Sequence, residues 1–291
     1  MYGVLRSKRW SGRRRRLPSG SLVADGAQGR AEIVGLLRRH GVTPAKRLGQ
    51  NFLVDPNIIR KIVDLAGVGP GDRVLEVGAG TGTLTRELAA SGCDVLAYEV
   101  DERMRPILDE VLRGTDNVEV RFADAASAEI TGGSWTVVAN LPYYLSTTLL
   151  LDWLQAGPQP ERFVVMVQRE VAERLAAGPG SRVYGIPSVI ARLYATPRLA
   201  FRVPATVFYP QPEVESAVVE LIRHEPPPHA ATAARLAATA FGQRRKMLRR
   251  SLAGTLPEPE TLLAAAGIDP RTRPEDLEVG QFLALAGVVD G

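Results

Sequence analysis

Apolar runs alternate with amphipathic segments along residues 72–177. Five short apolar runs predict strands, and they lie at 74–77, 95–100, 118–122, 137–139 and 163–167. The segments between and after them carry apolar residues at helical spacing, which predicts helices near 83–90, 101–113, 146–155 and 168–177. Strands that alternate with helices in this way are typical of a parallel sheet covered on both faces. The pattern therefore predicts an α/β fold.

Similar patterns continue on both sides of this region. Apolar spacing from Ile33 predicts one helix, and Asp55 followed by Pro56 predicts the start of a second. The reason is that an Asp cap and a proline in the first turn both suit a helix N-terminus. Two more strands are expected on either side of the proline-rich stretch VPATVFYPQPEVES, near 197–203 and 217–223.

Changes in composition divide the chain into three parts. Residues 1–29 are rich in Arg, Ser and Gly, and we expect a disordered basic arm there. A transit peptide and a mis-assigned start codon are the alternatives. A catalytic domain is expected over 30–225. Three consecutive prolines then mark a boundary, and the Ala- and Leu-rich remainder, 226–291, predicts a small all-helical domain.

Positive charge is concentrated in two places. The net charge is +4, but seven Lys and Arg residues precede the first acid, Asp25, so the rest of the chain sums to 4 − 7 = −3. A second window without acids, 226–257, holds six more cations. Two such surfaces indicate a polyanion as partner, although each run alone is more typical of a solvated face.

Composition also excludes several kinds of site. Cys93 is the single cysteine, which excludes an internal disulfide framework and a cysteine-rich zinc site. There are three scattered histidines, so no metal site is expected. No apolar stretch approaches the roughly 18 to 20 residues of a membrane helix, and no cleavable leader is visible. We expect a cytoplasmic monomer that does not bind membranes.

A glycine-rich loop lies between the first predicted strand and the following helix. In VLEVGAGTGTLT, Gly78, Gly80 and Gly82 have no Cβ, so the backbone can approach a ligand closely, although a tight turn alone would also favour them. Glu99 ends the next strand, where a carboxylate can accept both hydroxyls of a ribose. Asp124 follows the third strand and could accept from an adenine amino group. These positions predict an adenosine cofactor.

The glycine spacing distinguishes between adenosine cofactors. A nicotinamide enzyme would more often show G-x-G-x-x-G, and a P-loop would need a Lys-Ser/Thr pair that is absent. Here Glu76 precedes the loop and the spacing is G-x-G-x-G. This arrangement resembles motif I of S-adenosylmethionine-dependent methyltransferases.

The tetrapeptide NLPY, at the end of the fourth strand, resembles the signature of enzymes that methylate adenine N6. The Asn140 side-chain oxygen and the Leu141 carbonyl can accept the N6 hydrogens, while Pro142 stiffens the turn. Tyr143 could stack on a flipped base, and Phe208 is the candidate for the second face, because one ring barely offsets the cost of flipping. Taken alone, Tyr143 is equally typical of a core or rim aromatic.

Eight ordered segments from about residue 43 to the C-terminus resemble the ribosomal RNA adenine dimethyltransferase family. They are KRLGQNFLVD, LEVGAGTGTLT, YEVDERM, NLPYYLST, MVQREVAERLAAGPGSRVYG, VPATVFYPQPEVESAVV, AFGQRRKMLRRSL and GIDPRTRPEDL. The resemblance implies a Rossmann-like methyltransferase domain with a mostly parallel seven-stranded sheet, followed by an all-helical C-terminal domain.

The resemblance also implies the roles of individual residues. GQNFL would be a lid-like segment over S-adenosylmethionine. The family's cofactor site falls on Asn51, Leu53, Gly78, Glu99, Asp124 and Asn140. Contacts with the RNA backbone fall on Arg244, Arg245, Lys246, Arg249 and Arg250.

Two branches of this family differ in substrate. AFGQRRKMLRRSL and GIDPRTRPEDL are features of the branch that dimethylates two adjacent adenines in a 3′-terminal hairpin loop of small-subunit (16S) RNA, within an immature ribosomal subunit. The alternatives are large-subunit methylation, which confers macrolide resistance, and an assembly factor that acts mainly by binding. One departure stands out: Glu213-Val-Glu215-Ser occupies the place of the family's frequent Lys-Val-Asp-Ser.

Overall fold

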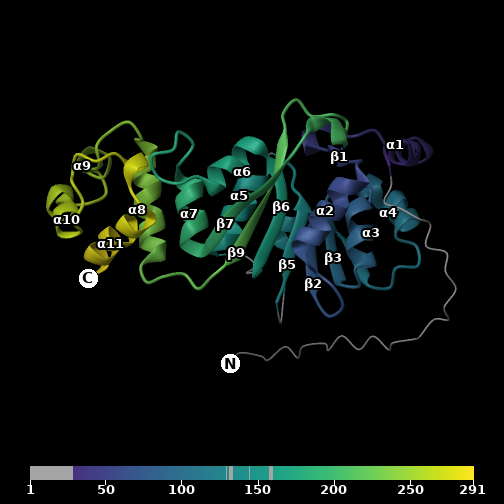
Figure 1. The fold of residues 1–291 in the computed structure, drawn as a ribbon, viewed down its shortest axis with the longest axis horizontal. Coiled ribbons are helices and arrows are strands. Elements are labelled where there is room, and N and C mark those ends of the chain that lie inside the picture. The colour runs from purple at the N-terminus through teal and green to yellow at the C-terminus, as the bar shows by residue number, and fades with distance from the viewer. Residues whose placement is uncertain (1–28, 129, 131–133, 144, 157–159) are drawn as a thin grey trace, which may run out of the picture.

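The computed structural model describes residues 29–128, 130, 134–143, 145–156 and 160–291. The expected arm therefore lies outside the described residues, except for Gly29. A central sheet flanked by helices occupies most of the molecule, and a group of helices from the C-terminal part lies at one end, opposite the first helix (Figure 1).

The sheet has seven strands in the order β4-β3-β2-β5-β6-β9-β7. The first five in this order are parallel to one another, and β9 runs antiparallel to both of its neighbours. This confirms the predicted mostly parallel sheet. The strands are β2 (Arg73–Val77), β3 (Asp94–Glu99), β4 (Val118–Phe122), β5 (Thr136–Asn140), β6 (Arg162–Gln168), β7 (Ala195–Val203) and β9 (Ser216–Arg223).

Helices cover both faces of the sheet, because successive strand residues point to opposite sides. On one face Val74 packs with α1 (Arg30–Arg39), α2 (Pro56–Ala66), α3 (Thr83–Ala90) and α4 (Arg105–Val111). On the other face its neighbour Leu75 packs with α5 (Ser146–Gln155), α6 (Arg169–Ala176) and α7 (Ile186–Tyr194). Helix α7 was not predicted from the sequence.

The start of α2 follows from its cap. The Asp55 carboxylate accepts hydrogen bonds from the backbone N–H of Asn57 (2.8 Å) and Ile58 (3.3 Å), and Pro56 occupies the first turn. These bonds satisfy amide groups that no helical carbonyl can reach. The predicted boundary is therefore confirmed.

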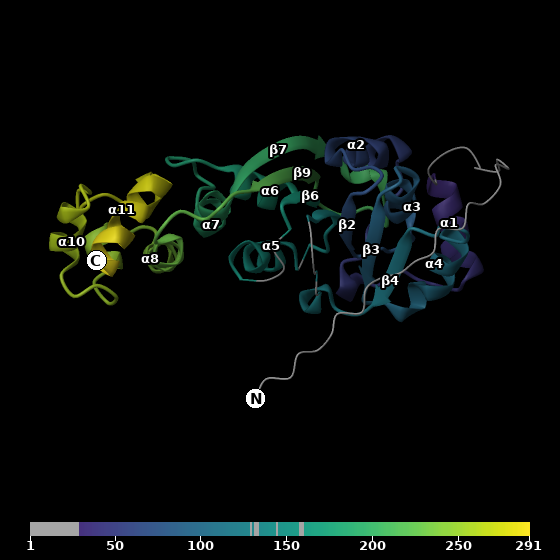
Figure 2. The same cartoon turned by 90° about the horizontal axis from the view of Figure 1, so that it is seen from below.

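The C-terminal part is helical, as predicted. Its helices are α8 (Ala230–Gly242), α9 (Leu248–Ser251), α10 (Pro259–Ala265) and α11 (Val279–Asp290). They pack beyond α7 at one end of the molecule (Figure 2). Their buried residues belong to the same apolar cluster as one face of the sheet, so the core continues across the proline boundary.

Polar contacts fasten this helical part to the loop between α6 and α7. The Arg244 guanidinium lies 2.6 Å from a Glu275 carboxylate oxygen and donates to the Arg182 carbonyl at 2.9 Å. The Gly180 N–H donates to the Glu275 carbonyl at 2.8 Å, and the Tyr184 hydroxyl donates to the Leu277 carbonyl at 2.9 Å. Arg244 thus joins two segments that are far apart in the sequence.

A second, two-stranded sheet was not expected. Strand β1 (Phe52–Leu53) pairs antiparallel with β8 (Phe208–Tyr209), and the Val54 N–H donates to the Val207 carbonyl at 2.8 Å. The pairing places GQNFL beside the proline-rich loop. Within the described part of the chain, no helix combines the length and apolar character needed to cross a membrane.

Replacing Arg244 with Ala should lower the free energy of unfolding by about 1 kcal/mol, because it removes a charged hydrogen bond at a half-exposed site. The matched control is Arg245→Ala, whose side chain is exposed and for which we expect a change within about 0.5 kcal/mol. Urea titrations of both full-length variants measure the difference. Equal midpoints for the two would contradict the structural role of Arg244.

Candidate active site

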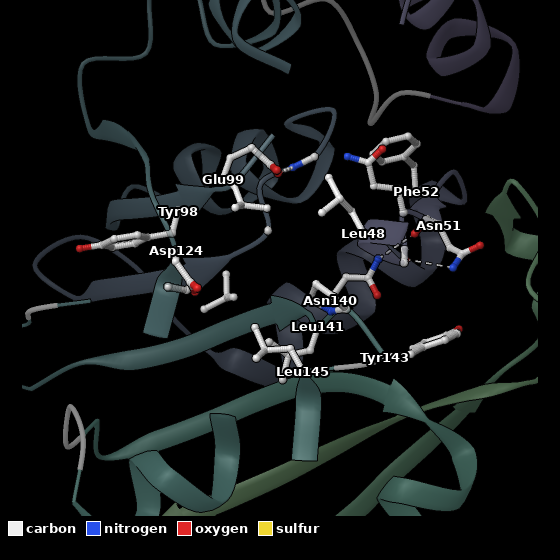
Figure 3. Close-up of a pocket in the computed structure, with 18 of the residues that line it drawn as sticks. Leu48, Asn51, Phe52, Tyr98, Glu99, Asp124, Asn140, Leu141, Tyr143 and Leu145 are labelled. Carbon is white, nitrogen blue, oxygen red and sulfur yellow. Dashed lines mark hydrogen bonds between the residues drawn. The ribbon is translucent and has the colours of Figure 1, made fainter. Parts of the chain in front are cut away.

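A pocket opens at the carboxyl ends of β2, β3 and β5 and beside the loop after β4. Parallel strands place these ends at one edge of the sheet, where ligands bind in open α/β folds. Figure 3 shows Glu99 and Asp124 on one side, Asn140 and Leu141 on another, and Leu48, Asn51 and Phe52 across from them. Five predicted cofactor residues line this pocket, namely Asn51, Gly78, Glu99, Asp124 and Asn140.

The glycine loop forms the floor of the pocket. The Gly78 N–H donates to the Tyr98 carbonyl at 2.8 Å, which fastens the loop to β3. Gly80 has φ +55°, and a Cβ on it would lie 3.1 Å from the Phe52 ring. A side chain at position 80 would therefore strain the backbone and push against the segment opposite.

Glu99, the last residue of β3, is 5 % exposed. Its carboxylate accepts hydrogen bonds from the Gly80 N–H and the Asp101 N–H, both at 2.8 Å. Burial raises the pKa of Glu99. Each carboxylate oxygen can accept from more than one donor, so the group retains acceptor capacity toward the pocket.

Asp124 lies two residues beyond β4 and is exposed at the edge of the pocket. Its carboxylate accepts from the Ala126 N–H at 2.9 Å and so begins the short turn that follows. That bond fixes one oxygen and holds the side chain in place.

Asn140 ends β5. Its side-chain N–H donates to the Asn51 carbonyl at 3.0 Å, which joins the strand end to the segment before β1 (Figure 3). With the amide nitrogen engaged in this way, the side-chain oxygen of Asn140 is the atom that can accept from a ligand. Leu53 is a different case, because its side chain is buried in the core and lines a smaller cavity behind the glycine loop.

The structure brings Tyr143 to the pocket but not Phe208. The Tyr143 hydroxyl lies 2.7 Å from the Ser216 hydroxyl at the start of β9, and burial raises the pKa of Tyr143. The Phe208 side chain is 0 % exposed, packs in the core and pairs through its backbone with Leu53. This corrects the expectation that Phe208 offers a second ring face to a base.

Comparison with known proteins decides the family. The family profile described as "Ribosomal RNA adenine dimethylase" matches residues 43–290. The chain belongs to this family. The resemblance seen in the sequence is thereby confirmed, and the chain is an adenine dimethyltransferase of ribosomal RNA.

Curated relatives match along most of their length. A "Ribosomal RNA small subunit methyltransferase A" from Phenylobacterium zucineum is 46 % identical over 257 residues, which cover 86 % of this chain and 90 % of that protein. A protein of the same name from Cereibacter sphaeroides is 44 % identical and covers 88 % of this chain and 96 % of its own length.

Solved structures share the fold. The 23S rRNA methyltransferase ErmE is 29 % identical with a TM-score of 0.66, and the alignment covers 83 % of this chain and 100 % of that one. A dimethyladenosine transferase from Plasmodium falciparum is 25 % identical with a TM-score of 0.70, covering 80 % and 95 %.

Two of the five cations expected to contact the RNA backbone, here called the basic cluster, lie in ion pairs within this dimethyltransferase. Arg244 is bound to Glu275, and Arg249 lies 3.0 Å from Glu260. The window 226–257 contains no acid, but the fold brings these two carboxylates to it from later in the chain. The exposed side chains for which the described structure shows no ion pair are Arg245, Lys246 and Arg250.

The sequence did not point to three side chains beside the pocket. Gln50 donates to the Asp101 carboxylate at 2.8 Å, and Arg103 contacts the same carboxylate at 2.6 Å. Gln50 and Asp101 lie in two of the segments that resemble the family, GQNFL and YEVDERM. That resemblance was the sequence signal that could have pointed to them. Among the described residues, no group of three or more His, Cys, Asp or Glu side chains is arranged to hold a metal ion.

Glu76 is buried below the glycine loop, and one of its carboxylate oxygens has no hydrogen-bond partner in the described structure. Burial, with a smaller contribution from the nearby Glu99 charge, raises its pKa to about 8. The side chain is therefore protonated at neutral pH in the folded protein and ionised in the unfolded chain.

This difference predicts a pH-dependent stability. The folded state holds a proton on Glu76 that the unfolded state releases above about pH 4.5, so this group makes stability fall as pH rises toward 8. Glu76→Gln should remove that loss and be more stable than wild type at pH 8, with the gap shrinking toward pH 5. Urea titrations across this range test it, with exposed Glu213→Gln as control. Parallel profiles for wild type and Glu76→Gln would refute the assignment.

Proposed function

We propose that this dimethyltransferase transfers methyl groups from S-adenosylmethionine to N6 of two adjacent adenosines in a 3′-terminal hairpin loop of small-subunit rRNA, within an immature ribosomal subunit. The observation that carries the proposal is the convergence of Glu99 and the Asn140–Tyr143 turn in one pocket. The small-subunit substrate is supported by the names of relatives that are 38–46 % identical.

The pocket residues fit S-adenosylmethionine. Glu99 retains acceptor capacity for ribose hydroxyls, and Asp124 stands at the edge as an acceptor for an adenine amino group. The glycine loop admits a ligand close to its backbone at Gly78 and Gly80, which line the pocket and have no side chains. When bound, the cofactor supplies an electrophilic methyl group on a positively charged sulfur. We further propose that Asn51 and the backbone at Leu53 and Gly78 contact it.

The Asn140 turn would prepare the target nitrogen. Its lone pair is delocalised into the purine ring, so acceptors aimed at the N6 hydrogens favour a pyramidal nitrogen with a freed lone pair. The Asn140 oxygen and the Leu141 carbonyl would be these acceptors, and both residues line the pocket. The methyl group would pass to N6 while the sulfur departs as a neutral thioether, and N6 would release one of its protons to water. A strong general base is not required.

Contact with the RNA backbone would come from the exposed part of the basic cluster. Arg245, Lys246 and Arg250 have free charge to neutralise phosphates, whereas Arg244 and Arg249 are held by Glu275 and Glu260. The acidic EVES stretch is partly neutralised, because the Arg169 guanidinium lies 2.7 Å from the Glu215 carboxylate. We propose that the enzyme acts as a monomer and needs no metal.

Asn140→Ala should lower methylation of immature small subunits by about 100-fold, because it removes an oriented polar contact to the reacting group. Binding of the subunit should persist, which separates an enzyme from a factor that acts by binding. The measurement is mass spectrometry of rRNA from a strain lacking the gene and complemented with each variant. Methylation that survives the substitution would refute the role of Asn140. Gene-dependent methylation of large-subunit RNA instead of small-subunit RNA would refute the proposed substrate.

Tyr143→Ala should lower kcat/KM for the RNA by about 10- to 100-fold, since stacking on an aromatic ring is worth about 1–3 kcal/mol per base. Tyr143→Phe is the matched control, because it keeps the ring and removes only the hydroxyl that contacts Ser216. Steady-state kinetics with unmethylated subunits compare the two. Equal activity of Tyr143→Ala and wild type would exclude stacking by this residue.

A further inference from the structure

The segment 45–53, here called the roof segment, crosses the pocket opposite the glycine loop. Residues Leu48 to Phe52 line the pocket, and the Phe52 ring packs against Gly80. One end of the roof segment is held by the β1–β8 pairing and by the Asn140 side chain, which donates to the Asn51 carbonyl. Just before the other end, the Arg103 guanidinium donates to the Thr43 carbonyl at 3.4 Å.

Gln50 attaches this end of the roof segment more closely and uses both ends of its amide, one for a contact with another element and one for a contact within the segment. Its side-chain N–H donates to the Asp101 carboxylate at 2.8 Å, and its side-chain oxygen accepts from the Ala45 N–H at 2.8 Å. The first bond joins the roof segment to the turn after β3. The second braces the roof segment internally, across the short turn at Lys46–Leu48.

Asp101 is a fixed point for this contact. It is 6 % exposed, and Arg103 holds its carboxylate through the guanidinium at 2.6 and 2.8 Å. Hydrogen bonds from Arg103 hold the pKa of Asp101 below its usual range, so the carboxylate stays ionised. A hydrogen bond from Gln50 to an ionised, oriented acceptor is stronger than one between neutral groups.

The same residue also connects to the predicted ribose carboxylate. The Asp101 N–H donates to Glu99 at 2.8 Å, and the other Glu99 oxygen accepts from the Gly80 N–H. A continuous series of hydrogen bonds therefore runs from Ala45 through Gln50, Asp101 and Glu99 to Gly80. It links the roof segment, the end of β3 and the glycine loop of one pocket.

We propose that Gln50 and Asp101 are positioning residues that latch the roof segment over the cofactor and set how slowly the cofactor leaves. This rests on the proposed use of S-adenosylmethionine. A ligand beneath the roof segment leaves when that segment lifts, and lifting the Ala45 end breaks the Gln50–Asp101 bond while β1–β8 stays paired. Gln50 thus acts through the roof segment rather than on the reacting atoms.

Two substitutions separate the latch from a merely internal brace. Gln50→Leu removes both hydrogen bonds. Gln50→Glu keeps an oxygen that can accept from the Ala45 N–H but places a second carboxylate against ionised Asp101. If Gln50 only braces the roof segment, the Glu variant should resemble wild type. If Gln50 is a latch, the Glu variant should release ligand at least as fast as the Leu variant.

The experiment uses full-length protein and S-adenosylhomocysteine, whose dissociation is followed by stopped-flow competition. Both variants should dissociate about tenfold faster than wild type, as expected for loss of a charged hydrogen bond. The control is Gln243→Leu, an exposed glutamine in the helical part, which should leave the rate unchanged. Thermal melting establishes that each variant is folded.

A second measurement needs no ligand. Amide hydrogen exchange of the roof segment should accelerate in both variants, with the Ala45 amide most affected in Gln50→Leu. The latch would be overturned if either variant, Gln50→Leu or Gln50→Glu, released S-adenosylhomocysteine and exchanged its roof amides at the same rates as wild type. If wild-type protein bound no S-adenosylhomocysteine, the proposed function would fail instead. Amide hydrogen exchange of the roof segment would then be the measurement that decides whether Gln50 latches it.

Discussion

The parallel pairing of β3, β2 and β5 is the constraint on which the rest of the structure depends. In this register Val77 lies opposite Tyr98, and Asn140 ends the strand on the other side of β2. The glycine loop, Glu99 and the Asn140 turn therefore meet at one edge, although they are spread over more than sixty residues of sequence. Packed helices on both faces fix that edge, so the site is positioned by the core rather than by its loops.

The polar groups at this edge also hold one another. Glu99 is bound to the glycine loop and to Asp101, Asp101 to Gln50, and Asn140 to the Asn51 carbonyl. Such bonds preorganise a site, because the side chains need little reordering when a ligand arrives. The same bonds account for the burial of charged groups that would otherwise be costly to remove from water.

Local patterns predicted most of the helices and strands, but helix α7, the β1–β8 sheet and the long-range contacts were not predicted. The Asp55 cap, the strands and the polar residues at their ends follow from periodicity and from short motifs, which depend on neighbours in sequence. Phe208 was misplaced because its burial depends on pairing with the distant Leu53. Arg244 and its partner Glu275 are 31 residues apart, so an acid-free window gave no sign that the cation is bound. Family resemblance supplied residue roles that periodicity alone could not.

A crystal structure of the protein with S-adenosylhomocysteine tests the central claim most directly. The account predicts the nucleoside in the pocket at the strand ends, its ribose hydroxyls on the Glu99 carboxylate, its sulfur facing Asn140 and the roof segment closed over it. A nucleoside bound away from Glu99, or a sulfur turned away from the Asn140 turn, would contradict the account.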